Sequence, residues 1–174
     1  MIRTCWSLSQ AGAHGRDKCG GRGRGSTLLE LSLVLLPTLA LILAIIDFSI
    51  TVFVRSVLYQ AVTEGVRYAI TYRTFPGLSH SESIKQVVQQ RAMGFLSGPS
   101  GLSKIRVRYY SPITFAELSG AGANSSGNIV EVSVENFSWS PIVPLWRSGN
   151  PISIQAVAAD RLQSLPFGAA MPPP

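Results

Sequence analysis

The stretch from Leu28 to Val54 reads LLELSLVLLPTLALILAIIDFSITVFV and is the most apolar part of this 174-residue chain. Its central portion, Leu31 to Ile46, contains no charged residue. As an α-helix that rises about 1.5 Å per residue, the stretch would be roughly 40 Å long, which exceeds a hydrocarbon core of about 30 Å. We therefore predict one membrane-spanning helix.

A cleaved secretory signal is the main alternative for an apolar segment near the start of a chain. The apolar region of such a signal is about 7–15 residues long and is followed by a small-x-small cleavage site. This run is longer, and it continues into Asp47-Phe48-Ser49-Ile50 without an Ala-x-Ala site. We expect the helix to be retained in the membrane over residues 26–54.

Two residues inside the span require an explanation. A carboxylate at the centre of a membrane helix costs about 3 kcal/mol and less near an end, so Glu30 is either an interfacial residue or a required charge-pairing or recognition element. Pro37 lacks a backbone N–H and predicts a kink or one loosened turn.

Basic residues are concentrated before the span. Residues 1–25 contain five basic residues and one acidic residue, whereas Arg55 alone lies just after the apolar run. Because positive residues stay on the cytoplasmic side, we expect residues 1–25 to be a cytoplasmic leader and the C-terminal part to be exported. The formal net charge of +6 thus belongs mainly to the leader, and no basic stripe for nucleic acid follows.

The sequence contains no recognisable catalytic or metal-binding set. Both cysteines, Cys5 and Cys19, lie in the leader with His14, and their spacing matches no closed zinc pattern. The other histidine, His80, has no nearby Asp/Glu pair. We predict that the protein is not an enzyme and has no metal, cofactor or small-molecule substrate.

Beyond the span, the periodicity predicts an α+β domain. The helical pattern continues through residues 55–73, and Ser79-x-x-Glu82 predicts a capping box for a second helix. Three segments then alternate apolar and polar residues, which predicts a roughly three-stranded antiparallel sheet in a small domain over residues 74–166. Their alternating parts are Ile105–Tyr109, Val130–Glu135 and Ile152–Ala156. Arg106 and Arg108 are expected to face Glu131 and Glu135 across one strand pair.

Three further segments are interpreted as loops. The glycine-rich segment Ser119–Gly127 is expected to be flexible, and residues 167–174 to form a disordered Pro-rich tail. The apolar segment Trp139–Trp146 is expected to lie on the membrane surface, to contact a partner, or to cap the core of the domain.

The leader and the start of the span resemble the cleavage motif of type IV prepilins. The run Arg24-Gly25-Ser26-Thr27-Leu28-Leu29-Glu30 has a basic leader ending in Gly, followed five residues later by Glu. The resemblance extends to the TadE-like proteins of tight-adherence (Flp) pilus systems. The matching residues, in order, are Glu30, Pro37, Asp47-Phe48 and the run Thr63-Glu64-Gly65-Val66-Arg67-Tyr68-Ala69.

This resemblance implies a minor pilin or pseudopilin with a pilin-like fold, held in the bacterial inner membrane by a single span. A prepilin peptidase would cleave between Gly25 and Ser26. Glu30 would then pair with the N-terminal amine of a neighbouring subunit, and Asp47, Phe48, Glu64, Gly65 and Arg67 are the remaining family positions. The implied partners are membrane lipid, the peptidase, other pilin-like subunits and the pilus assembly platform.

Two other classes of protein stay open at this stage. The first is an unprocessed single-pass anchored subunit of an envelope secretion or assembly complex, in which Glu30 would be interfacial. The second is a membrane-tethered enzyme, which would require a polar pocket in the exported domain.

Overall fold

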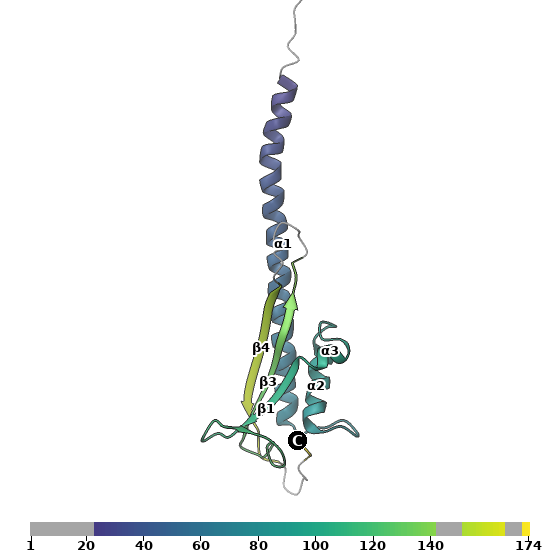
Figure 1. Cartoon of the computed structure of the whole chain (residues 1–174), viewed down its shortest axis with the longest axis vertical. Helices are drawn as coiled ribbons and strands as arrows, with labels where there is room; N and C mark the ends of the chain where they lie inside the picture. Colours follow the sequence, from purple (N-terminus) through teal and green to yellow (C-terminus); the bar gives the residue numbers. More distant parts are fainter. Residues whose placement is uncertain (1–22, 142–150, 166–171) are drawn as a thin grey trace, which may run out of the picture. The chain divides into compact units, whose positions relative to one another are not determined.

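The computed structural model describes residues 23–141, 151–165 and 172–174 (Figure 1). The chain divides into two compact units, Met1–Leu39 and Ala40–Pro174. Helix α1 (Gly23–Ile70) starts in the first unit and continues into the second. In the described part of the first unit, residues 23–39, the backbone is helical throughout, including Pro37.

The second unit contains the rest of α1, two further helices and a sheet. After α1 come α2 (His80–Arg91), the short α3 (Gly98–Leu102) and four strands. The strands are β1 (Ile105–Tyr110), β2 (Glu117–Leu118), β3 (Ile129–Trp139) and β4 (Ile152–Arg161). They form one sheet in the order β2-β1-β3-β4, with every neighbouring pair antiparallel. The unit is thus α+β with a short antiparallel sheet (Figure 1).

Strand register places the apolar side chains on one face. In the β1–β3 pair, Ile105 lies opposite Val134 and Val107 opposite Val132, while Arg108 lies opposite Glu131. Since successive side chains alternate between faces, the valines share one face and the charged residues the other. In the β3–β4 pair the register shifts between Val134 and Phe137, as expected for a β-bulge.

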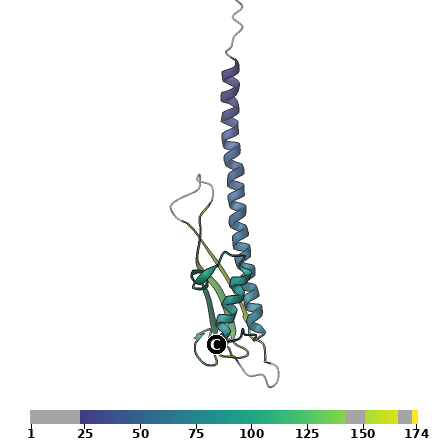
Figure 2. The same ribbon diagram turned by 90° about the vertical axis from the view of Figure 1, so that its right-hand side faces the viewer.

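Both long helices cover the apolar face of this sheet. A Cβ built on Gly65 of α1 would lie within van der Waals contact of Val132 Cγ1, while His80 of α2 contacts Tyr109 of β1. Tyr109 and Val132 lie on the same face, so α1 and α2 pack side by side on it (Figure 2). The core between the two layers consists mainly of aliphatic side chains, among them Leu58, Ile84 and Val130, and it also contains Tyr109 and Phe137.

The second helix begins where the sequence predicted its cap. Ser79 Oγ accepts a hydrogen bond from the Glu82 amide at 3.3 Å, and the Glu82 carboxylate accepts one from the Ser79 amide at 3.0 Å. These reciprocal bonds satisfy two backbone donors that the first turn of α2 leaves unpaired. Helix α1 ends at Ile70, before a residue with positive φ, Tyr72 (φ 52°).

The predicted α+β class with one long N-terminal apolar helix is confirmed. Two elements were not anticipated: β2 adds a two-residue edge strand, and α3 forms at a segment that the sequence analysis did not assign to a helix. Pro99 lies in the first turn of α3, where a backbone N–H would have no intrahelical acceptor, so the helix tolerates proline at this position. The boundaries proposed at residues 25, 54, 73 and 166 stay predictions.

Candidate functional site

The predicted cleavage site lies at the very start of α1. Because α1 begins at Gly23, the Gly25–Ser26 peptide bond belongs to its first turn. The amide groups of a first turn have no acceptor four residues earlier, so this turn opens more easily than the helix interior. The geometry leaves the backbone at Gly25 helical but weakly held, and glycine lowers its helical stability further.

The first part of the apolar stretch of α1, residues 28–39, is exposed on all sides. Leu29 is 72% exposed, Leu33 76% and Leu36 69%, and none of the most apolar window of the helix is buried within the protein. Full burial of one such side chain removes about 1.5–3 kcal/mol of unfavourable hydration. An apolar helix segment that the described part of the chain leaves uncovered is suited to contact with lipid or with other apolar helices. By length and composition α1 is a candidate single membrane span.

Hydroxyl groups within this stretch are bonded to the helix itself. Ser32 Oγ donates to the Leu29 carbonyl at 2.9 Å, and Thr38 Oγ1 donates to the Val34 carbonyl at 2.7 Å. Such bonds to the preceding turn remove the cost of an unpaired hydroxyl in lipid. Glu30 is the one acidic residue among residues 23–39, and it lies on the exposed surface of the helix.

Asp47 and Phe48 are adjacent in sequence but have different surroundings. The side chain of Asp47 is 5% exposed and that of Phe48 is 71% exposed. Asp47 lies on the same face of α1 as Val54 and Leu58, which belong to the core of the second unit. Asp47 is therefore covered by the second unit, while Phe48 stays largely exposed.

The second group of family positions, Glu64, Gly65 and Arg67, also divides between two faces. Gly65 lies where α1 crosses α2: a Cβ added there would be 2.4 Å from Val88 Cγ2. Only glycine allows this close approach of the two helices. Glu64 and Arg67 lie on the open side of α1, with Arg67 Nη1 4.0 Å from Glu64 Oε2 and side chains 42% and 74% exposed. An exposed pair of this kind contributes little stability.

That open side of α1 borders a groove of about 580 Å³ between α1 and α2. Its lining includes Tyr59, Glu64 and Arg67 from α1, followed by Arg91 and Met93. The groove is shallow and mixed in character, so its chemistry fits contact with another protein surface better than capture of a reacting small molecule.

A buried polar cluster at the end of α1 was not expected from the sequence. His80 is fully buried; its Nε2 lies 3.2 Å from the Ala69 carbonyl and its Nδ1 lies 3.1 Å from the Tyr109 hydroxyl. Since a carbonyl only accepts, Nε2 carries the proton and Nδ1 accepts from Tyr109. The ring also stacks on Tyr72, with centroids 5.6 Å apart.

Burial sets the protonation of this cluster. It lowers the pKa of His80, which the hydrogen bond to Ala69 partly opposes, and it raises the pKa of Tyr109. Both side chains are therefore neutral near pH 7 and act as hydrogen-bonding core residues. In the sequence, His80 stands out only because it lies beside the cap of α2. That position does not indicate that its side chain is buried.

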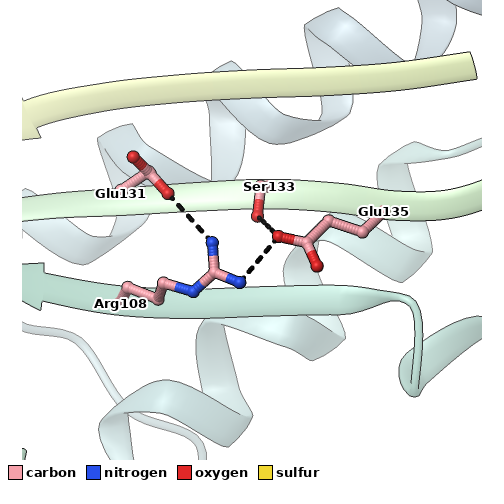
Figure 3. A network of polar contacts seen from close by, with 4 residues as sticks. All are labelled: Arg108, Glu131, Ser133 and Glu135. Atoms are coloured by element: carbon pink, nitrogen blue, oxygen red, sulfur yellow. Dashed lines mark hydrogen bonds and ion pairs between the residues drawn. The ribbon is translucent and has the colours of Figure 1, made fainter.

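The predicted cross-strand charge cluster is confirmed for Arg108. Figure 3 shows its guanidinium between two carboxylates of β3: Nη2 lies 2.8 Å from Glu135 Oε1 and Nη1 lies 3.5 Å from Glu131 Oε1. Ser133 Oγ donates to the same Glu135 oxygen at 3.3 Å. The neighbouring carboxylate of Glu135 raises the pKa of Arg108. These contacts join β1 to β3.

Other predicted features fall partly or wholly outside the described residues. Two predicted features belong to the parts that the structure does not describe: residues 1–22 of the leader with both cysteines, and residues 142–146 of the Trp139–Trp146 segment. Trp139 itself packs edge-on against Phe95, with ring centroids 6.1 Å apart. At the C-terminal end, the Pro173 carbonyl accepts a hydrogen bond from the His80 amide at 2.9 Å. Among the described residues, no group of three or more His, Cys, Asp or Glu side chains is placed to hold a metal ion.

These features define a class of protein: an α+β domain attached to a single long apolar helix that has the properties of a membrane anchor. Residues 25–67 match the family model of the TadE-like proteins, from the predicted cleavage position to Arg67. The chain is therefore similar to the TadE-like proteins over this segment, which includes the apolar stretch of α1. No curated protein and no solved structure matches the chain.

Proposed function

We propose that this chain is a TadE-like minor pilin or pseudopilin, a structural membrane component of tight-adherence (Flp) pilus assembly. The observation that carries the proposal is the family match over residues 25–67, which begins at Gly25 and covers the whole apolar stretch of α1. The family is one of pilus-assembly components and not of enzymes. The α+β domain would serve recognition of other subunits.

In this proposal a prepilin peptidase cuts the chain between Gly25 and Ser26. The chain is inserted in the bacterial inner membrane with its leader in the cytoplasm and its domain exported. Cleavage requires an extended backbone at the bond that is cut, and the first turn of α1 is the part of the helix that opens most readily. Removal of the leader creates a free amine at Ser26.

Glu30 has a specific role in this proposal. It lies one helical turn from Ser26 and on the exposed surface of α1, where a neighbouring helix can reach it. Two opposite charges that meet within lipid avoid the cost that each would have alone. Glu30 of one subunit would therefore pair with the new N-terminal amine of the next, and Pro37 would adjust the helix for that packing.

The first experiment is mass spectrometry of the mature N-terminus, from cells with and without the prepilin peptidase. A chain that starts at Ser26 only when the peptidase is present supports the proposed processing. Substitution of Gly25 by Ala provides the matched control, because it should leave membrane insertion intact while blocking cleavage.

An intact N-terminus in both strains would favour the second candidate, an unprocessed anchored subunit of an envelope secretion or assembly complex. Piliation of Glu30→Gln and Glu30→Ala strains separates the two further. Loss of assembly with stable protein levels is expected if Glu30 forms a charge pair. Wild-type piliation in both strains would contradict that role.

A further inference from the structure

The adjoining ends of β3 and β4, at Pro141 and Ile152, lie beside the apolar part of α1, and these two residues are called the hairpin end below. Leu41, Ile45 and Phe48 of α1 line a groove of about 610 Å³ together with Pro141 and Ile152. All of these residues belong to the second unit. The end of the hairpin is therefore at the same level along α1 as residues 41–51.

The length of the apolar run decides what surrounds that level. About 20 residues of helix cross a hydrocarbon core. Any such segment placed between Leu28 and Val54 includes residues 35–47, so Leu41 and Ile45 lie within the hydrocarbon in every placement. The hairpin end must then reach the outer leaflet of the membrane.

A carboxylate on α1 limits how deep this level can lie. Asp47 has 5% of its surface exposed, and an acidic residue costs most at the centre of the hydrocarbon and less near its edge. Asp47 therefore places the outer boundary of the hydrocarbon close to its own level, which corresponds to a span that starts near Leu28.

The surface at this boundary is apolar and open. Ile152 is 44% exposed and Phe48 is 71% exposed, and they continue the exposed apolar surface that α1 presents at Leu41 and Ile45. A continuous apolar surface of this kind favours an apolar covering. Because it is an extension of the membrane-anchor surface, acyl chains of the outer leaflet are the occupant that fits it.

We propose that the end of the β3–β4 hairpin is a lipid-contacting element, which seats the domain directly on the membrane with Pro141 and Ile152 against acyl chains near the headgroup boundary. The domain is then fixed close to the bilayer and does not stand off on a helical stalk. This seating requires neither cleavage at Gly25 nor assembly with other subunits.

The test places a fluorescent bimane label at single cysteines of the full-length chain. The background carries Cys5→Ser and Cys19→Ser, since these are the only cysteines in the sequence. Ile152→Cys reports on the hairpin end, and Phe48→Cys reports on α1 at the same level. Val157→Cys is the matched control: it lies on the same strand with a similar exposure of 48%, about 17 Å further along at roughly 3.3 Å per residue.

Each variant is reconstituted into phosphatidylcholine vesicles. Quenching is measured with a phosphatidylcholine that carries a doxyl group near the headgroup end of its acyl chain, and with iodide present on both sides of the membrane. We expect the lipid quencher to reduce emission from positions 152 and 48 at least twofold more than from position 157. Iodide should show the opposite order.

Three outcomes would overturn the proposal. Iodide quenching at position 152 equal to that at 157 would mean that the hairpin end is in water. Quenching of 152 by neither agent would mean that protein covers it, from this chain or from a second copy. Equal lipid quenching of 152 and 157 would mean that the whole strand lies on lipid. Pro141→Cys, at the same groove on the side of β3, supplies an independent reading if the Ile152 variant folds poorly.

Discussion

Substitution of Gly65 by Ala tests the close approach of α1 and α2. The new Cβ would lie 2.4 Å from Val88 Cγ2, 3.6 Å from Ile84 Cγ2 and 3.7 Å from Val132 Cγ1. Since carbon atoms in contact are about 3.5–4.0 Å apart, the first contact is short by more than about 1 Å. All three partners are fully buried, so none of them can move aside into solvent.

Two opposing effects determine whether Gly65→Ala raises or lowers the free energy of unfolding. In a helix, Ala is favoured over Gly by about 1 kcal/mol. Overpacking a full core costs about 1–3 kcal/mol, and Val88 cannot relieve the clash cheaply because valine in a helix keeps one χ1 rotamer. We expect Gly65→Ala to lower the free energy of unfolding by up to about 2 kcal/mol.

The assay is urea unfolding of the full-length chain in detergent micelles, with the folded fraction measured by pulse proteolysis. Gln60→Gly and Gln60→Ala provide the control, because Gln60 is exposed on the same helix and reports propensity alone. A double-mutant cycle with Val88→Ala isolates the contact. That substitution removes the methyl groups that the new Cβ would meet, so the double variant should be more stable than the sum of the single effects predicts.

A stabilisation of about 1 kcal/mol by Gly65→Ala, equal to the propensity difference measured at Gln60, would refute this reasoning. Additivity of Gly65→Ala and Val88→Ala would refute it as well. Either result would mean that α1 and α2 do not approach closely at this position.

Three other predictions concern the same domain. The folded state lowers the pKa of His80, so the unfolded chain binds the proton more readily. The free energy of unfolding should therefore fall as the pH drops below about 6.5. Urea titrations between pH 7 and pH 5 should show that His80→Gln removes this dependence. Arg108→Met leaves two carboxylates on β3 without their cation, so it should lower the urea midpoint in low salt and lower it less in high salt. Arg106 is exposed, and Arg106→Met should leave the midpoint nearly unchanged at both salt concentrations. Ser79→Ala removes the capping box and should lower the thermal midpoint, because the domain loses about 1 kcal/mol of stability. Ser81→Ala is the control, since Ser81 lies outside the reciprocal bonds of that box. An equal loss of stability in both variants would contradict a specific cap.

The sequence determined those features that depend on local pattern. The apolar run of Leu28–Val54 is too long and too apolar for an ordinary domain helix, and its composition alone indicates a membrane span. The spacing of Ser79 and Glu82 set the start of α2, and period-two alternation set β1, β3 and β4. Even the pairing of Arg108 with Glu131 and Glu135 followed from alternation, because side chains on one face of neighbouring strands must meet.

Features that depend on which surfaces meet were decided only by the tertiary structure. His80 is a polar residue beside a cap in sequence, and it is fully buried because α2 lies against the end of α1 and β1. The segment Ser119–Gly127 was expected to be flexible, yet Asn124 is fully buried and donates to the Pro172 carbonyl at 2.8 Å. No periodicity encodes such contacts, since both partners lie far apart along the chain.

The family positions show the same division. The sequence singled out Gly65 through the order of residues in the TadE-like segment, but its physical reason, the crossing with Val88, exists only when α1 and α2 are packed together. Likewise, the alternation of apolar residues predicted β3 and β4 without showing that Pro141 and Ile152, at their adjoining ends, lie beside Leu41 and Ile45 of α1. Local periodicity specifies elements because it acts within a few residues, whereas the level at which two elements meet is fixed by packing of the whole domain.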